Sequence, residues 1–187
     1  MHPSSAEALA TVIEVLHANE IPYMLVGAIS SNAYGYPRST NDADLVIEYQ
    51  PGVLKVLGEA LGNDFTLDSQ ISMELQTGTL RNILTYIPTQ FDIELFRLGL
   101  DPHDRERFAR RRHLRLPDLS IDAVLPTAED VVIQKLRWGR DKDLADARVV
   151  IAVQAPQLDW GYLRSWTDRH GTTAVLDRLL SELKISG

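Results

Sequence analysis

The chain contains no cysteine among its 187 residues. That absence excludes disulfide bonds, zinc sites built on thiolates and a cysteine nucleophile. Aromatic residues make up only 7% of the sequence, and no uncharged stretch is long enough to span a bilayer. A secretory leader is not evident either, because Glu14 interrupts the only apolar run near the start. We therefore expect a cytoplasmic protein with no membrane partner.

The residues that are present fit one globular domain, with or without a small appendage. The hydrophobic content of 44% is enough to bury a sizeable core in a chain of this length. The net charge of -7 argues against nucleic-acid binding over the whole surface. A local basic patch remains compatible with that total.

Hydrophobic periodicity divides the chain into a mixed front part, residues 1–125, and a helical back part, residues 126–187, packed on that core. Strands are expected at residues 23–26, 42–49, 81–87, 91–96, 113–116 and 121–125. A first helix is expected to begin at a capping box with Ser4 as its N-cap. Further helices are expected at residues 28–34, 51–61 and 67–76, after Asp101, from Thr127 onward, and at residues 141–153, 159–169 and 173–183. The fold class is therefore α+β, with a mixed sheet flanked by helices.

Two aspartates stand at the start of the second expected strand, in the run VGAISSNAYGYPRSTNDADL. Residues i and i+2 of a strand share a face, so Asp42 and Asp44 are neighbours while Ala43 points into the core. Two adjacent carboxylates repel each other unless a cation or a shared proton relieves them. Grouped oxygen ligands suit Mg²⁺, which leaves room for water and phosphate oxygens.

A third carboxylate and a glycine turn strengthen this hypothesis. The strand FDIEL carries Asp92 and Glu94 on one face, and carboxylates from two neighbouring strands can hold two metal ions for phosphoryl transfer. Gly27 lies where a strand turns into a short helix, a position at which a phosphate can approach the backbone N–H groups. Ser30 and Ser31 add hydroxyls nearby, and Arg38 is placed to hold a triphosphate or an incoming strand.

The order of these motifs resembles the nucleotidyltransferase superfamily related to DNA polymerase β. In that superfamily a Gly-Gly or Gly-Ser turn precedes an Asp-x-Asp strand; here Gly27-Ala28 precedes Asp42-Ala43-Asp44. The segment YGYPRSTNDADL, together with PTAED, Lys135 and RDKDLAD downstream, is similar to the bacterial AbiEii-like group and its uncharacterised relatives. The resemblance covers roughly residues 23–150.

The resemblance implies a role for each matching residue. Asp42, Asp44 and Asp92 would be the catalytic and metal-binding carboxylates for two Mg²⁺ ions, with Asp92 as the base. An NTP would be the substrate, held by Gly27, Ala28, Ser30, Arg38 and Lys135. Arg140, Lys142 and Asp143 would line the site from the helical part. Ala28 departs from the family pattern, because it stands where a second glycine or a serine is usual and offers no hydroxyl.

The acceptor is left open by the sequence. Six arginines between Arg105 and Arg115 suggest binding of RNA, such as a tRNA end, by phosphate neutralisation. A solvated helix end whose cations suit the helix dipole is the alternative, and the sequence favours it. A protein acceptor, as in toxin-antitoxin systems, and a small antibiotic-like acceptor are alternatives. A non-catalytic module of the same fold that binds a nucleotide or a partner is a further alternative, favoured by Ala28.

Overall fold

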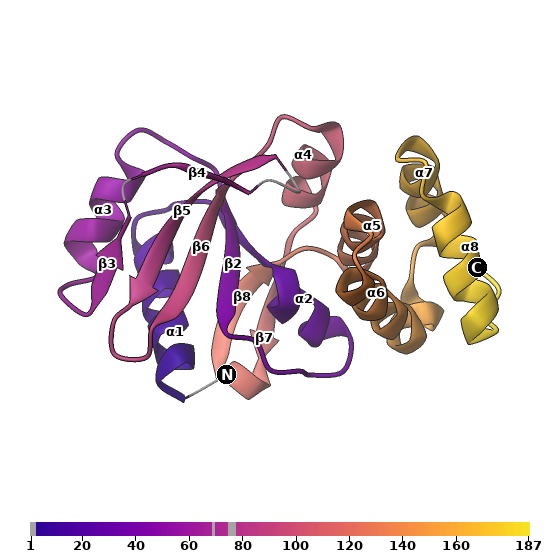
Figure 1. Cartoon of the computed structure of the whole chain (residues 1–187), viewed down its shortest axis with the longest axis horizontal. Coiled ribbons are helices and arrows are strands. Elements are labelled where there is room, and N and C mark those ends of the chain that lie inside the picture. The colour runs from indigo at the N-terminus through magenta and orange to yellow at the C-terminus, as the bar shows by residue number, and fades with distance from the viewer. Residues whose placement is uncertain (1–2, 69, 75–77) are drawn as a thin grey trace.

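The computed structural model describes residues 3–68, 70–74 and 78–187. Figure 1 shows a sheet with helices at one end of the molecule and a group of helices at the other. The helices are α1 (Pro3–Ala18), α2 (Gly27–Tyr34), α3 (Val53–Ala60), α4 (Pro102–Ala109), α5 (Ala128–Trp138), α6 (Asp141–Gln154), α7 (Trp160–Arg169) and α8 (Thr173–Leu183), with short 3-10 turns at η1 (Pro117–Leu119) and η2 (Ala155–Gln157). The strands are β1 (Tyr23–Val26), β2 (Asp42–Ile47), β3 (Phe65–Leu67), β4 (Ser72–Glu74), β5 (Thr79–Tyr86), β6 (Phe91–Arg97), β7 (Arg112–Leu116) and β8 (Ile121–Leu125).

The main sheet has the strand order β1-β2-β6-β5-β3, and β4 pairs with β5. β2 and β6 run parallel, whereas β1 is antiparallel to β2, and β5 is antiparallel to β6, β3 and β4. The expected mixed sheet is confirmed. The parallel pair lies at its centre, so the two strands that carry the acidic residues are direct neighbours.

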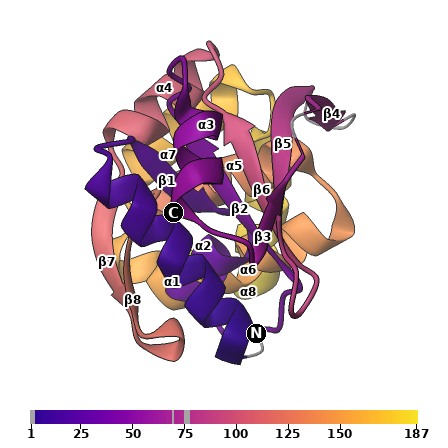
Figure 2. The ribbon, with the colours of Figure 1, turned by 90° about the vertical axis from the view of Figure 1, so that its left-hand side faces the viewer.

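The two faces of this sheet differ in chemistry. On one face, Leu45 and Ile93 belong to the large hydrophobic core, which α1 and α3 cover (Figure 2). The second sheet, made of β7 and β8, joins this core through Tyr23, whose hydroxyl accepts a hydrogen bond from the Val124 amide at 3.3 Å. The opposite face carries the acidic positions of β2 and β6, and it is the face on which a site can form.

The helical back part has a hydrophobic core of its own. That core begins at Ala128 and includes buried residues of α5 to α8, whereas the core of the sheet ends with Leu125. A domain boundary between residues 125 and 126 stays a prediction, although the two clusters lie on either side of it. Among the described helices, none combines the length and the apolar character needed to span a membrane.

Two expectations about local structure are wrong. The helix expected at residues 67–76 is absent where the chain is described: Phe65–Leu67 and Ser72–Glu74 are strands paired with β5, and Ser69, Leu75 and Gln76 lie outside the described residues. Ser4 is not an N-cap, because its backbone already lies inside α1. In the first case pairing with β5 overrides the local pattern, and in the second α1 begins earlier than the capping motif predicts.

Candidate functional site

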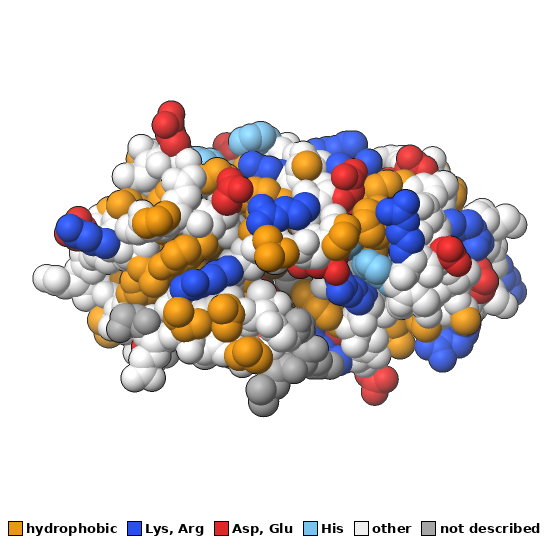
Figure 3. All heavy atoms as spheres, turned by 90° about the horizontal axis from the view of Figure 1, so that it is seen from above, with side chains coloured by type: hydrophobic (Ala, Val, Ile, Leu, Met, Phe, Trp, Pro, Cys, Tyr) orange, Lys and Arg blue, Asp and Glu red, His pale blue; other side chains and the backbone are white. Residues whose placement is uncertain are grey.

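A cleft of about 1050 Å³ lies on the acidic face of the sheet, and α5 and the start of α6 form its other wall. Seen from above, acidic and basic side chains gather around a hollow near the middle of the molecule (Figure 3). The predicted site residues that line the cleft are Gly27, Ala28, Arg38, Asp42, Asp44, Lys135, Arg140 and Lys142. Ser30, Asp92 and Asp143 do not line it.

The acidic wall of the cleft is fixed by strand register. The parallel pairing sets Asp42 beside Asp92 and Asp44 beside Glu94. Asp42 accepts a hydrogen bond from the Thr40 hydroxyl at 2.7 Å, and Asp92 accepts one from the Thr85 hydroxyl at 2.6 Å. Four carboxylates therefore share one face of two adjacent strands.

Of the four carboxylates, Asp44 is the one whose ionised form is most disfavoured by its surroundings. Burial, together with the neighbouring carboxylates of Asp42 and Glu94, raises the pKa of Asp44 to about 7, although Lys135 and Lys142 counteract the rise. Among the described residues no Lys, Arg or His side chain is within ion-pairing distance of Asp44, whereas Arg81 pairs with Glu94. A carboxylate in this position is stabilised by any cation that reaches it.

Because Gly27 has no side chain, it leaves the space that the Asp44 carboxylate occupies. The residue has φ +63, and a Cβ atom added to it would lie 1.8 Å from the Asp44 Oδ2 atom. The turn from β1 into α2 is also tied by Ser30 and Ser31, whose buried hydroxyls donate to the Gly27 carbonyl oxygen at 2.9 and 3.2 Å. The hydroxyl of Ser30 is thus used inside α2, so the residue contributes to the turn.

The basic wall is an ion network that links α5, α6 and the segment before β2. The Lys135 Nζ atom donates to Asp143 at 3.0 Å and to Asp146 at 2.8 Å. Asp146 in turn receives two parallel hydrogen bonds, both 3.0 Å, from the Arg38 guanidinium, and Arg140 pairs with Asp143. The order along the network is therefore Arg38, Asp146, Lys135, Asp143, Arg140.

This network sets the charge state of its acids. Burial alone would raise the pKa of Asp143, but hydrogen bonds from Arg140 and Lys135 hold it below its usual range. The same balance, with Arg38 and Lys135 as donors, lowers the pKa of Asp146. Both aspartates are buried and ionised at neutral pH, so they anchor the three cations at the cleft.

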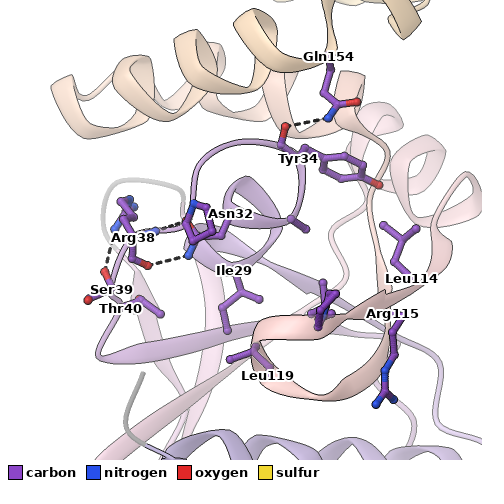
Figure 4. Close-up of a pocket in the computed structure, with 14 residues that line it drawn as sticks. Ile29, Asn32, Tyr34, Arg38, Ser39, Thr40, Leu114, Arg115, Leu119 and Gln154 are labelled. Carbon is purple, nitrogen blue, oxygen red and sulfur yellow. Dashed lines mark hydrogen bonds between the residues drawn. The ribbon is translucent and has the colours of Figure 1, made fainter.

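A second cavity of about 620 Å³ adjoins the first, between α2, residues 37–40 and the β7–η1 segment (Figure 4). Arg38, Ser39 and Thr40 line both cavities. The Asn32 side chain holds this segment, because it donates to the Arg38 carbonyl at 2.7 Å and accepts from the Arg38 amide at 3.2 Å. The segment of Arg38, Ser39 and Thr40, in which Arg38 binds Asp146, therefore separates the two cavities.

The arginine-rich stretch between Arg105 and Arg115 does not form one free patch. Arg107 is buried and pairs with Asp104 at 3.0 Å, and Arg115 pairs with Asp122 at 2.7 Å. Arg110 lies 3.8 Å from the centre of the Tyr162 ring, beside Asp130. Several of these cations are thus committed to contacts within the protein.

Sequence reasoning assigned no role to several residues in or behind the cleft. Asp146 joins Arg38 to Lys135, although the two ends of the Arg38–Asp146 bond are 108 residues apart in the chain. Thr40 and Arg81 orient acidic side chains, and Gln134 and Trp138 also line the cleft. For Asp146 a signal existed, because it lies three residues after Asp143 on one helix face.

A metal ion fits the donor set in one respect and not in another. In the described ranges, no group of three or more His, Cys, Asp or Glu side chains is arranged to hold a metal ion. The pair Asp42 and Asp44 nevertheless offers oxygen ligands on one strand face beside the cleft. Mg²⁺ commonly binds through one or two carboxylates, with substrate phosphates completing its shell, so this pair fits magnesium that arrives with a nucleotide.

Comparisons with known proteins identify the fold. No family model matches the sequence, and no curated protein matches it. Among solved structures, an antigenic nucleotidyltransferase-like protein from Paracoccidioides brasiliensis is similar, with a TM-score of 0.63, 18% identity, and coverage of 98% of this chain and 94% of that one.

The antibiotic-resistance factor ANT(2″)-Ia is similar as well. Its solution structure gives a TM-score of 0.59 at 11% identity, covering 95% of this chain and 97% of that one. Its complex with adenylyl-2″-tobramycin gives 0.58 at 11% identity, covering 91% and 99%. At these identities the likeness concerns the fold alone. The chain therefore has the α+β fold of nucleotidyltransferase-like proteins.

Proposed function

We propose that this protein is a magnesium-dependent nucleotidyltransferase that moves a nucleoside monophosphate from an NTP to an acceptor hydroxyl. The observation that carries the proposal is the cleft itself, in which the carboxylates of β2 share one space with Lys135, Arg140 and Lys142. Phosphoryl transfer requires carboxylates that attract a divalent cation and, opposite them, cations that attract phosphates.

Each part of the cleft has a function in this proposal. Asp42 and Asp44 would hold magnesium, two ions in the full assembly, and the metal would supply charge neutralisation for the triphosphate and for the attacking oxygen. The helix start at Gly27 and Ala28 offers backbone N–H groups to phosphate oxygens. Lys142 and Arg140 lie at the cleft surface to meet the triphosphate, and buried Lys135 holds Asp143 and Asp146 in place behind them.

The nucleoside monophosphate moves to the acceptor in a single displacement step. The acceptor oxygen forms a bond to the α-phosphorus, the bond from that phosphorus to the bridging oxygen breaks, and pyrophosphate leaves with the electron pair. The acceptor proton passes to a carboxylate. We assign that carboxylate to Asp92, which does not itself line the cleft but lies beside Asp42 in the parallel register and has no cationic partner among the described residues, whereas Arg81 pairs with Glu94.

The AbiEii-like grouping and a toxin-antitoxin setting are finer versions of this proposal, with RNA or a protein as acceptor. The fold likeness to ANT(2″)-Ia favours a second version, a small-molecule acceptor. Ala28 favours a third, a nucleotide-binding module without turnover. Binding of an NTP without pyrophosphate release on any acceptor would support the third version over the other two.

The first test is isothermal titration of ATP, CTP, GTP and UTP, with and without Mg²⁺. The native protein is compared with an Asp42→Asn/Asp44→Asn variant, with Asp141→Asn as the matched control because Asp141 is exposed and does not line the cleft. Magnesium-dependent binding that the double variant loses supports the proposal. Equal binding by the native protein and the double variant would refute it.

A further inference from the structure

Trp138 differs from the other tryptophans of the chain in how it packs. Of the three, Trp160 and Trp166 pack in the hydrophobic core of the back part, whereas Trp138 belongs to none of the hydrophobic clusters that the described residues form. It is the last residue of α5, it is partly exposed, and it lines the cleft beside Lys135. An aromatic ring that lines a cleft without packing in the core is typical of a ligand-binding surface.

The cations near Trp138 lie on one side of its ring. The Lys135 Nζ atom and the Arg140 guanidinium are each 5.5 Å from the ring centre. Both also bind the Oδ1 atom of Asp143, Lys135 at 3.0 Å and Arg140 at 3.2 Å. Groups that share one oxygen are too close together to take opposite faces of an indole. In the part of the chain that the structure describes, the second face therefore has neither a cation nor an aromatic ring against it.

Trp138 also lies next to the groups that would meet a triphosphate. The pKa of Arg140 is raised, mainly by its hydrogen bond to Asp143, and the charge of Asp44 contributes to the rise from across the cleft. A triphosphate between Asp44 and Arg140 would thus have its phosphates close to the indole. In an NTP one ribose separates the α-phosphate from the base, a span comparable to the 5.5 Å between the Arg140 guanidinium and the ring centre.

We infer that Trp138 is the platform on which the base of the NTP stacks. This inference rests on the proposed function and deepens it, because it names the residue that distinguishes a nucleoside triphosphate from other polyphosphates. The base lies on the face of the indole opposite Lys135 and Arg140, where offset stacking adds to affinity. Stacking on an aromatic ring is tolerant of base identity, so Trp138 selects for the presence of a base.

A purely structural role of Trp138 leads to a different expectation. The indole would then only cover the ion pairs of Lys135 and Arg140 with Asp143. Its loss would loosen the basic wall and weaken every polyphosphate ligand to the same degree. A stacking platform instead affects only those ligands that carry a base.

The experiment titrates the full chain in Mg²⁺ with α,β-methylene-ATP and, separately, with inorganic tripolyphosphate, followed by calorimetry and by tryptophan fluorescence. In Trp138→Leu the nucleotide should bind about tenfold more weakly, while tripolyphosphate, which has no base, should bind within about twofold of the native protein. Trp138→Phe keeps an aromatic ring, so it should bind the nucleotide within about threefold of the native protein. It should nevertheless lose the quenching of tryptophan emission that the stacked base causes. Trp160→Phe is the control and should keep the quenching, because Trp160 packs in the core and does not line the cleft.

Three results would overturn the inference: equal weakening of both ligands in Trp138→Leu, unchanged nucleotide binding in Trp138→Leu, or quenching that persists in Trp138→Phe. The Asp42→Asn/Asp44→Asn variant separates this test from the proposed function. Nucleotide binding that depends on Trp138 but not on Mg²⁺ or these aspartates supports the platform and contradicts the proposed metal site. A native protein that binds neither probe overturns both.

Discussion

The Asp44 carboxylate lies against the Gly27 α-carbon, in the space that a side chain at position 27 would fill. The glycine that follows β1 and the second aspartate of β2 are therefore complementary in shape. Their contact explains why a glycine precedes this strand even though the two residues are 17 positions apart in the chain.

Gly27→Ala should destabilise the fold and disturb the site together. The new methyl group would meet Asp44 Oδ2 at 1.8 Å, in a backbone conformation with φ +63, so we expect a loss of about 2–3 kcal/mol in the free energy of unfolding and weaker magnesium-nucleotide binding. Gly62→Ala is the control, since Gly62 has φ +70 with nothing within 4 Å. Equal losses in urea unfolding for both variants would show that the contact with Asp44 contributes nothing.

Asp44 should make the metal-free protein less stable at higher pH. Because its folded pKa of about 7 exceeds the ordinary aspartate value of 3.8, its stabilising contribution is complete below about pH 4 and is lost as pH rises through 7. Asp44→Asn does not titrate, so its stability should gain roughly 1–3 kcal/mol on the native protein between pH 5 and pH 8. Urea unfolding in EDTA measures this difference, and a constant difference across the range would contradict it.

Asp146→Ala should break the network behind the basic wall. Arg38 would lose its carboxylate partner and Lys135 would keep only Asp143, so we expect a loss of about 2–4 kcal/mol in the free energy of unfolding. Asp141→Ala in the same helix should cost less than about 1 kcal/mol. Thermal unfolding gives both values, and matching values would mean that the network adds no stability.

Asp92→Asn and Glu94→Gln separate the roles of the two carboxylates of β6. If Asp92 accepts the proton, Asp92→Asn should lower kcat by about 10²- to 10⁴-fold. Glu94→Gln should change kcat by less than about tenfold and lower stability instead, because Arg81 loses its charged partner. Pyrophosphate release in the presence of the acceptor reports kcat, and the reverse ranking would move the base to Glu94.

Strong local patterns made much of the fold predictable. The short apolar run 23–26 and the helix 173–183 have the predicted bounds, because a glycine limits the first and a continuous apolar stripe defines the second. The prediction for residues 67–76 failed because the two strands there depend on pairing with β5, which lies beyond the local sequence pattern.

The site was predictable only in part. Asp42 and Asp44 follow from a two-residue spacing on one strand, whereas the partners of Arg38 and Lys135 depend on how α6 packs against α2 and α5. The sequence of residues 105–115 predicts a cationic patch, but Arg105 pairs with Glu48, and Arg110 with Glu129 and Asp130, all distant in sequence. Contacts of that kind are set by tertiary packing, which a local pattern does not contain.

The parallel pairing of β2 with β6 also means that the packing of the interior fixes the positions of the acidic residues. Ala43, Leu45, Ile93 and Leu95 are all buried, and a slip of one residue in either strand would turn carboxylates inward and aliphatic side chains outward. Burial of these apolar side chains therefore disfavours any shift in register that would misplace the acidic residues. A substitution that loosened this packing would weaken the site without touching a single polar atom.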